Sequence, residues 1–306
     1  MPDPPRPTAG VAFGLAAYLW WGLCPIYFKS VAHVPAAEVL AHRIVWSLIL
    51  LLLLMWRRGR LAELVEAARQ PRVIIALSVS TVLVALNWFV FIWAVSTGQL
   101  LQASLGYFIN PLVNVLLGVV VLRERLRPWQ LLSLTLAVGA VVLLGLRQGA
   151  VPVISLTLAF SFSLYGLIRK LANVGATAGL TIETALLTPV ALGVLLLWNG
   201  QGTLVFAHLD RSTDILLALS GVVTALPLIW FAAGARRLRY ATMGFLHYVT
   251  PTGQFLLAVL AYGEVFGAQR LLSFALIWLA LVIFTADAAA SYRRVRPRQA
   301  DQARGS

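Results

Sequence analysis

The chain has 306 residues, of which 60% are hydrophobic and 11% are charged, and its mean hydropathy is +0.86. This composition excludes an ordinary soluble domain and predicts a polytopic membrane protein. The formal net charge is +13, a value that would also suit a nucleic-acid-binding protein unless the position of the charges explains it.

Ten apolar segments predict an all-α integral membrane protein with ten transmembrane helices. A helix needs about 20 residues to cross a hydrocarbon layer of ~30 Å, and residues 73–122 contain no Asp, Glu, Lys, Arg or His, so this run must hold two spans. Segments of about 18 to 23 residues favour helices over the short strands of a barrel. The expected spans are 9–28, 38–56, 73–95, 101–122, 129–146, 152–170, 179–198, 213–235, 242–262 and 271–289.

The second segment holds the densest group of ionisable residues within a span, namely Glu38, His42 and Arg43. Arginine at the bilayer centre costs about 3 kcal/mol on insertion scales, so we expect Arg43 to face protein or water. Two interpretations stay open. The group could couple protons or bind an anion, or Glu38 could favour a helix start while His42 and Arg43 pair or snorkel.

The third segment places the amide of Asn87 beside the indole of Trp88, with further aromatic residues close by. An amide next to aromatic rings could bind an aromatic or amphipathic solute by stacking and one hydrogen bond. The alternative is an asparagine that bonds between helices while the aromatic side chains face lipid.

The fourth segment carries small and polar residues at four-residue spacing, and the ninth segment repeats the pattern 140 residues later. Such a stripe lies on one helix face. It either lets two helices approach closely or lines a central cavity. The cavity candidates on the two segments are Tyr107, Asn110 and Asn114, and His247, Tyr248, Thr250 and Gln254.

Both stripes contain a proline, Pro111 and Pro251, each followed thirteen positions later by a glutamate, Glu124 and Glu264. Proline inside a helix removes a hydrogen bond and opposes the carbonyl four residues earlier, so the two prolines are candidates for hinges. A simple kink is the alternative. The glutamates stand beside arginines, which predicts structural ion pairs at the loops.

The internal repeat with an offset of 140 residues suggests two copies of one unit, residues 1–147 and 148–292. A basic cytoplasmic tail is expected to follow at 293–306. Each unit holds five predicted spans. Because five is odd, the second copy crosses the membrane upside down relative to the first.

The position of the basic residues explains the net charge without nucleic acid. Of the 24 Lys and Arg residues, 19 fall on the side of the two termini, four fall on the opposite side, and Arg43 lies inside a span. This asymmetry predicts that both termini are cytoplasmic. The single cysteine, Cys24, excludes an internal disulfide and a thiolate metal site. No metal or cofactor is expected.

Five stretches carry a resemblance that extends over nearly the whole chain: residues 17–22, 35–43, 87–95, 103–112 and 262–264. The fourth, Ala-Ser-Leu-Gly-Tyr-Phe-Ile-Asn-Pro-Leu, is the longest and most specific. With these stretches the chain resembles EamA-type permeases of the drug/metabolite transporter superfamily, most closely the RarD type. The resemblance implies a ten-helix permease of the bacterial inner membrane with two inverted repeats and alternating access. The RarD type is associated by name with chloramphenicol sensitivity.

The leading hypothesis is therefore a secondary transporter for a small organic solute, with a cavity lined by the third, fourth, eighth and ninth spans. A proton is a candidate coupling ion, and a homodimer stays open. No Gly-x4-Gly-Lys-Ser/Thr loop occurs. Two alternatives are weaker: an intramembrane enzyme using Glu38 and His42, for which no partner constellation is present, and a membrane sensor or scaffold. We therefore expect that the protein is not an enzyme.

Overall fold

The computed structural model describes residues 7–121, 123, 126–172, 174–235 and 246–302, and all regular structure within them is helical. The first part of the chain forms α1 (Pro7–Ser30), α2 (Ala36–Arg57), α3 (Leu61–Ala68), α4 (Pro71–Ser96), α5 (Leu100–Val120) and α6 (Pro128–Gln148). The second part forms α7 (Val153–Ala172), α8 (Ala176–Gly200), α9 (Arg211–Ala235), α11 (Val249–Leu256), the π-helical turn η1 (Leu257–Ala261) and α12 (Ala268–Gln302).

Eight of the described helices are long and apolar enough to cross a membrane. They correspond to eight of the ten expected spans. The remaining two, expected at 152–170 and 242–262, coincide with shorter apolar helices at Val153–Arg169 and Val249–Ala261. The second of these expected spans also includes residues 242–245, which lie outside the described residues. The count of ten spans stays a prediction.

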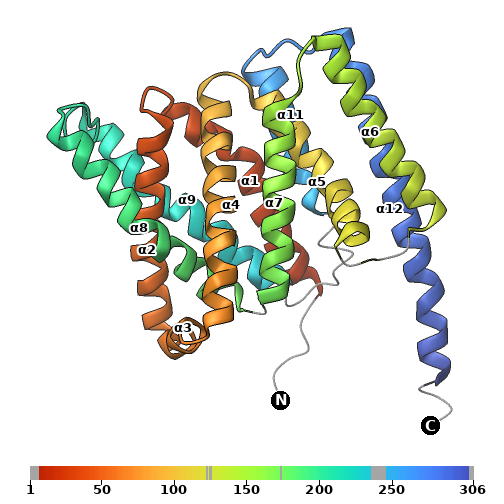
Figure 1. The fold of residues 1–306 in the computed structure, drawn as a ribbon, viewed down its shortest axis with the longest axis horizontal. Helices are drawn as coiled ribbons and strands as arrows, with labels where there is room; N and C mark the ends of the chain where they lie inside the picture. Colours follow the sequence, from red (N-terminus) through yellow and green to blue (C-terminus); the bar gives the residue numbers. More distant parts are fainter. Residues whose placement is uncertain (1–6, 122, 124–125, 173, 236–245, 303–306) are drawn as a thin grey trace.

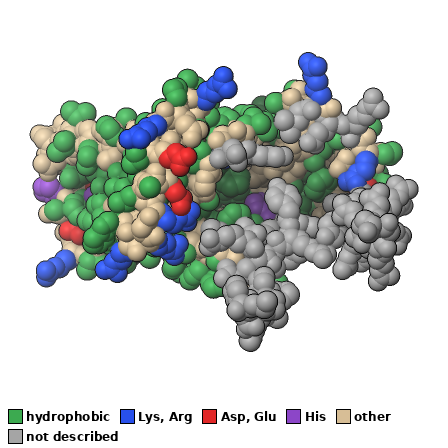
Figure 2. All heavy atoms as spheres, turned by 90° about the horizontal axis from the view of Figure 1, so that it is seen from below, with side chains coloured by type: hydrophobic (Ala, Val, Ile, Leu, Met, Phe, Trp, Pro, Cys, Tyr) green, Lys and Arg blue, Asp and Glu red, His purple; other side chains and the backbone are tan. Residues whose placement is uncertain are grey.

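The long helices run side by side between the two ends of the bundle (Figure 1). The beginning of α1 and the end of α12 lie at the same end, and α12 projects beyond its neighbours there. Residues 293–302 of the expected tail belong to this helix. Seen from that end, Lys and Arg side chains stand among hydrophobic side chains (Figure 2).

Helices that are far apart in the sequence pack together. Helix α1 packs against α9 and α11, α7 packs against α4 and α5, α2 packs against α8 and α9, and α6 packs along α12. The largest group of buried apolar residues draws on helices from both parts of the chain. Many large apolar side chains instead point outward, as expected for a surface in lipid.

Glycines allow two of these helix pairs to approach closely. A Cβ atom on Gly106 of α5 would lie 2.7 Å from the Ser155 carbonyl oxygen of α7. A Cβ atom on Gly234 of α9 would lie 2.9 Å from the Gly14 nitrogen of α1. No side chain fits at these crossings without a shift of the backbone, so each glycine fixes the distance between its two helices.

Two features of the chain were not expected from the apolar pattern. Helix α3 is a short helix between α2 and α4, and its first turn is closed by a two-pronged contact of Arg60 with Glu63, with both N–O distances 2.6 Å. The expected ninth span is interrupted by a turn at Tyr248, so that Pro251 falls in the first turn of α11. Proline is well tolerated there, because the first N–H groups of a helix have no partner within it.

Candidate functional site

Arg43 lies in the interior of the bundle, where α2 meets α1, α4 and α9. Its guanidinium carbon is 4.1 Å from the ring centroid of Trp88 and 5.5 Å from that of Phe28. Its Nε atom donates a hydrogen bond of 2.9 Å to the Thr224 Oγ1 atom. Cation–π contact and one neutral hydrogen bond thus hold the charge in place.

No carboxylate of the described residues lies within ion-pair distance of Arg43. The ionisable groups that interact with its charge are the thiol of Cys24 and the phenols of Tyr27 and Tyr107. Arg43, Trp88 and Tyr107 each keep some accessible surface, although they lie within long helices. We call Arg43, Trp88, Phe28, Tyr107 and Thr224 the Arg43 site.

Asn87 binds Tyr107 of this site and connects it to α7. Its amide nitrogen donates to the Leu158 carbonyl oxygen at 3.1 Å and to the Ser161 Oγ atom at 2.9 Å, both on α7. Its carbonyl oxygen accepts a hydrogen bond of 3.2 Å from the Tyr107 hydroxyl. The side chain is 1% exposed. Asn87 therefore joins α4 to α7 and orients Tyr107, which favours the interhelical interpretation for the amide.

The polar stripe of α5 divides between two environments. The side-chain amide oxygen of Asn110 accepts a hydrogen bond from the Ser163 hydroxyl of α7, which also lies 3.3 Å from the backbone carbonyl oxygen of Asn110, and Asn110 is 2% exposed. Asn114, one turn further along, is exposed. Gly106 and Asn110 thus form the contact with α7, and Asn114 does not share their surroundings.

The matching stripe of α11 faces α1. The Thr250 hydroxyl donates to the Tyr18 carbonyl oxygen at 2.9 Å, and the Gln254 amide donates to the Trp21 carbonyl oxygen at 3.3 Å. Next to them, Gly253 approaches the backbone of Gly22. Asn110 therefore contacts α7, whereas Thr250 and Gln254 contact α1, and these contacts favour the helix-contact interpretation for the three residues.

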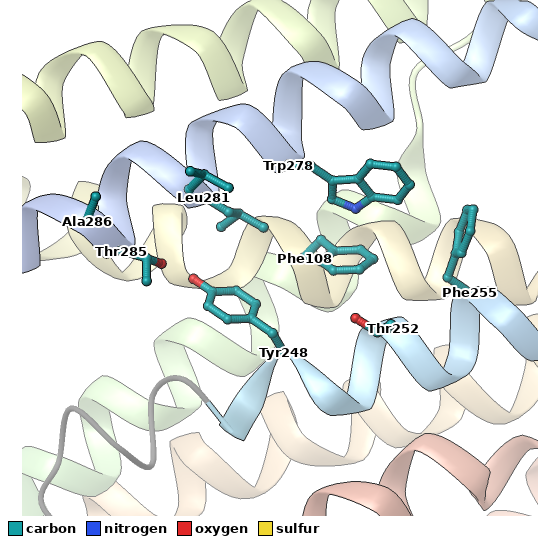
Figure 3. A pocket seen from close by; sticks show the side chains of 9 residues that line it. Phe108, Tyr248, Thr252, Phe255, Trp278, Leu281, Thr285 and Ala286 are labelled. Atoms are coloured by element: carbon teal, nitrogen blue, oxygen red, sulfur yellow. The ribbon is translucent and has the colours of Figure 1, made fainter. Parts of the chain in front are cut away.

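His247 and Tyr248, just before α11, lie apart from the Arg43 site. The His247 ring packs edge-on against Tyr18, with 5.7 Å between the ring centroids. Tyr248 lines a cavity of about 620 Å³ between α5, α11 and α12. Figure 3 shows its hydroxyl pointing toward Thr285, with Phe108, Trp278 and Phe255 on the side away from the hydroxyl. The described residues that line this cavity are apolar, aromatic or hydroxylic, and none of them is charged.

Glu38 and His42 point toward the connection between α8 and α9. The Glu38 carboxylate accepts hydrogen bonds from the backbone N–H groups of Val205 at 3.0 Å and Phe206 at 2.9 Å. The His42 ring lies on the Phe206 ring, with 4.5 Å between centroids. Because the carboxylate is occupied by amides, the geometry gives no support to an acid and base pair made of Glu38 and His42.

Glu264 makes the same kind of contact from the other part of the chain. Its two carboxylate oxygens accept hydrogen bonds from the Leu100 N–H at 2.7 Å and the Leu101 N–H at 2.8 Å, at the start of α5. Burial raises the pKa of the Glu264 carboxyl above its ordinary value. The expected ion pair with an arginine is thus replaced by helix capping. Glu124 lies outside the described residues.

Sequence reasoning did not identify the partners of these polar groups. Thr224, Ser161 and Ser163 carry hydrogen bonds of the site, but isolated hydroxyl residues are common in apolar helices and give no signal. Glu183 was not among the candidate site residues either. It is fully buried, accepts a hydrogen bond of 2.6 Å from the Ser80 hydroxyl, and lies 3.7 Å from the Arg169 Nε atom.

In the described residues, a helical bundle with eight helices of membrane-spanning length, an apolar outer surface and polar side chains within an apolar interior defines a multi-pass membrane protein. Comparison with known proteins identifies its family. The model of the EamA-like transporter family matches residues 8–146. Protein RarD of Escherichia coli is 45% identical over 292 residues, which cover 95% of this chain and 99% of that protein. The chain belongs to the EamA-like transporter family and is a RarD-type permease.

Other relatives agree with this assignment. An uncharacterized transporter of Bacillus subtilis, YojE, is 41% identical over 90% of this chain and 93% of its own length. The chloramphenicol-sensitive protein RarD of Pseudomonas aeruginosa is 33% identical over 93% of this chain and 96% of its own length. A crystal structure with 20% identity covers 91% of this chain and 97% of its own, with a TM-score of 0.59, which shows the fold alone. The chain is therefore a membrane transporter.

Proposed function

We propose that this permease is a secondary transporter of the bacterial inner membrane that moves a small organic solute by alternating access. Its ten spans form two inverted halves, residues 1–147 and 148–292, with both termini and the basic tail at 293–306 in the cytoplasm. The solute site lies between the halves, and a proton is the candidate coupling ion.

The observation that carries the proposal is the packing of helices between the two halves. If the halves are equivalent, α1 corresponds to α7, α4 to α9, α5 to α11 and α6 to α12. Exchanging the halves then turns the packing of α1 against α9 and α11 into the packing of α7 against α4 and α5. The pair of α6 and α12 is exchanged into itself. Such internal symmetry is typical of secondary transporters, whose solute sites lie at the repeat interface.

Two carboxylates, one buried and one partly buried, support a mechanism in which the halves separate at one end. Glu38 of the first half binds backbone amides of the second half, and Glu264 of the second half binds backbone amides of the first. Both contacts lie at the end of the bundle opposite to the start of α1 (Figure 1). We call these two contacts the carboxylate locks. Access from that end requires that the locks open.

The carboxylate locks also supply a route for proton coupling. A carboxylate accepts two amide hydrogen bonds, and protonation removes its charge and part of its acceptor capacity. Because burial raises the pKa of Glu264, this group binds a proton more readily than an exposed glutamate does. A proton taken up there weakens the lock, so that an inward proton gradient would favour opening.

Transport assays with purified protein in liposomes test the proposal. The test solutes are small organic anions, cations and neutral compounds, with chloramphenicol included because of the name of one relative. We expect saturable flux of one class, faster with an imposed pH gradient and absent from protein-free liposomes. Equal flux with and without protein for every class, in both directions, would contradict a transport function.

A further inference from the structure

We propose that Arg43 is the anion-binding group of the solute site and that the transported solute is an organic carboxylate with an apolar or aromatic body. The inference rests on the transport function proposed above and adds to it the chemical class of the solute. Its basis is a charge that the described part of the protein leaves without a counter-ion.

Arg43 and Arg169, both within long helices, differ in whether a carboxylate lies near their charge. Arg169 of α7 has a carboxylate partner, since its Nε atom lies 3.7 Å from the buried Glu183. Arg43 of α2 has no carboxylate within ion-pair distance among the described residues. A charged group inside a membrane bundle is costly unless it is paired or faces water, and residues of this kind mark the pathways of solutes and ions. The second partner of Arg43 is therefore expected from outside the chain.

The two Nη groups of Arg43 are positioned to donate hydrogen bonds to an anion. Thr224 takes the Nε hydrogen, and the rings of Trp88 and Phe28 contact the guanidinium group. The two Nη groups make no hydrogen bond to any residue that the structure describes. A guanidinium group presents such donors as a planar fork that matches the two oxygens of a carboxylate. Thr224 and the rings thus hold the fork in a fixed orientation before the ligand arrives.

The surroundings of the fork suit an apolar body attached to the carboxylate. Trp88 and Tyr107 keep accessible surface beside Arg43, and Tyr107 is oriented by its hydrogen bond to Asn87. Aromatic rings contribute apolar contact area and stacking, which an inorganic anion cannot use. A neutral or cationic solute would leave Arg43 without its partner. The site therefore selects carboxylates with an apolar body over amides, amines and simple salts.

Calorimetric binding measurements on the full chain in lipid nanodiscs test this selection. The probes are phenylacetate, its neutral isostere phenylacetamide, and sodium chloride, which separates an organic carboxylate from a free inorganic anion. We expect phenylacetate to bind at least about tenfold more tightly than phenylacetamide, as expected for the loss of one charged hydrogen-bonded contact. Equal affinity for the two isosteres, no binding of phenylacetate, or displacement of phenylacetate by chloride at equal concentration would overturn the proposal.

Variants of Arg43 test whether this residue causes the preference for phenylacetate over phenylacetamide. Arg43→Gln should reduce phenylacetate affinity about tenfold or more and leave phenylacetamide affinity unchanged, whereas Arg43→Lys keeps the charge, loses the fork and should lie in between. The matched control is Arg57→Gln, an exposed arginine at the end of the same helix, which should bind like the unmodified protein. If Arg43→Gln fails to fold, Arg43→Lys and Thr224→Val carry the test, and unchanged phenylacetate affinity in both overturns the proposal.

Binding and flux distinguish this inference from the transport proposal. Selective binding through Arg43 without flux of any solute in liposomes would retain the anion site and contradict transport. Flux of neutral solutes that persists unchanged in Arg43→Gln, with no carboxylate preference, would retain transport and remove the anion site.

Discussion

Polar residues of the interior serve two purposes, and only the structure separates them. Asn87 and Asn110 form hydrogen bonds with α7, whereas the two Nη groups of Arg43 have no hydrogen-bond partner among the described residues. All three could be identified from the sequence, because polar residues stand out in apolar runs. Their roles could not be assigned, since the partners on α7 are isolated residues about 50 to 70 positions away.

Asn110 and Asn114 offer a comparison at this scale. Asn110→Leu should lower the free energy of unfolding by about 1 kcal/mol, because it removes the side-chain bond to Ser163 and leaves that buried hydroxyl only the longer contact of 3.3 Å with the backbone carbonyl oxygen of residue 110. Asn114→Leu, one turn away on the exposed side of α5, should change stability little. Unfolding of the purified variants in mixed detergent micelles measures both. Equal stability of the two variants would contradict the assignment of Asn110 to the helix contact.

At the scale of helices, the apolar runs predicted the positions of the long elements well. Long apolar helices are visible in a sequence because each must provide about 20 consecutive apolar residues. Helix α3 and the turn at Tyr248 were not predicted. A helix of 8 residues carries little periodic signal, and the turn before Pro251 is defined by the packing of α11 against α1 rather than by the proline alone.

Glycines at the crossings give a prediction at the scale of helices. Gly106→Ala should destabilise the protein by about 1 to 3 kcal/mol, because the new Cβ atom would lie 2.7 Å from the Ser155 carbonyl oxygen and force α5 away from α7. The matched control is Gly139→Ala in α6, where no atom lies within 4 Å of the new Cβ. It should be neutral or stabilising, since alanine favours a helix. A thermal unfolding series compares the two, and a stable Gly106→Ala variant would argue against a tight crossing.

At the scale of the molecule, the repeat at 140 residues indicated two related halves but not how they meet. A sequence repeat shows that two units are similar, whereas the contacts between them depend on side chains of both. The carboxylate locks illustrate this difference. Glu264 was predicted to pair with a nearby arginine, and its partners are instead amides about 160 residues away.

The carboxylate locks give a prediction for the whole molecule. In the double variant Glu38→Gln and Glu264→Gln, neutral amides replace the carboxylates, so the bonds to the opposite half weaken. Spin labels at Gln99 and Thr203 lie in the connections beside the two locks. The distance between the two labels, measured by double electron–electron resonance, should be longer in this variant. The labels require a Cys24→Ser background.

Glu63→Gln is the control for this measurement. Glu63 pairs locally with Arg60 on the short helix α3, so its replacement should leave the separation of the labels unchanged. An unaltered separation in the double variant, or an equal increase in the control, would contradict the role of the locks in holding the halves together.

The locks have a further consequence for how sequences of this family can diverge. The donors at positions 100, 101, 205 and 206 are backbone N–H groups, which every amino acid except proline provides. A side-chain substitution at these positions therefore keeps the bonds of the locks, although it changes the packing of the buried Leu100 and Leu101 and the contact of Phe206 with His42. Proline is the exception, because at any of these four positions it would remove one N–H donor from a lock.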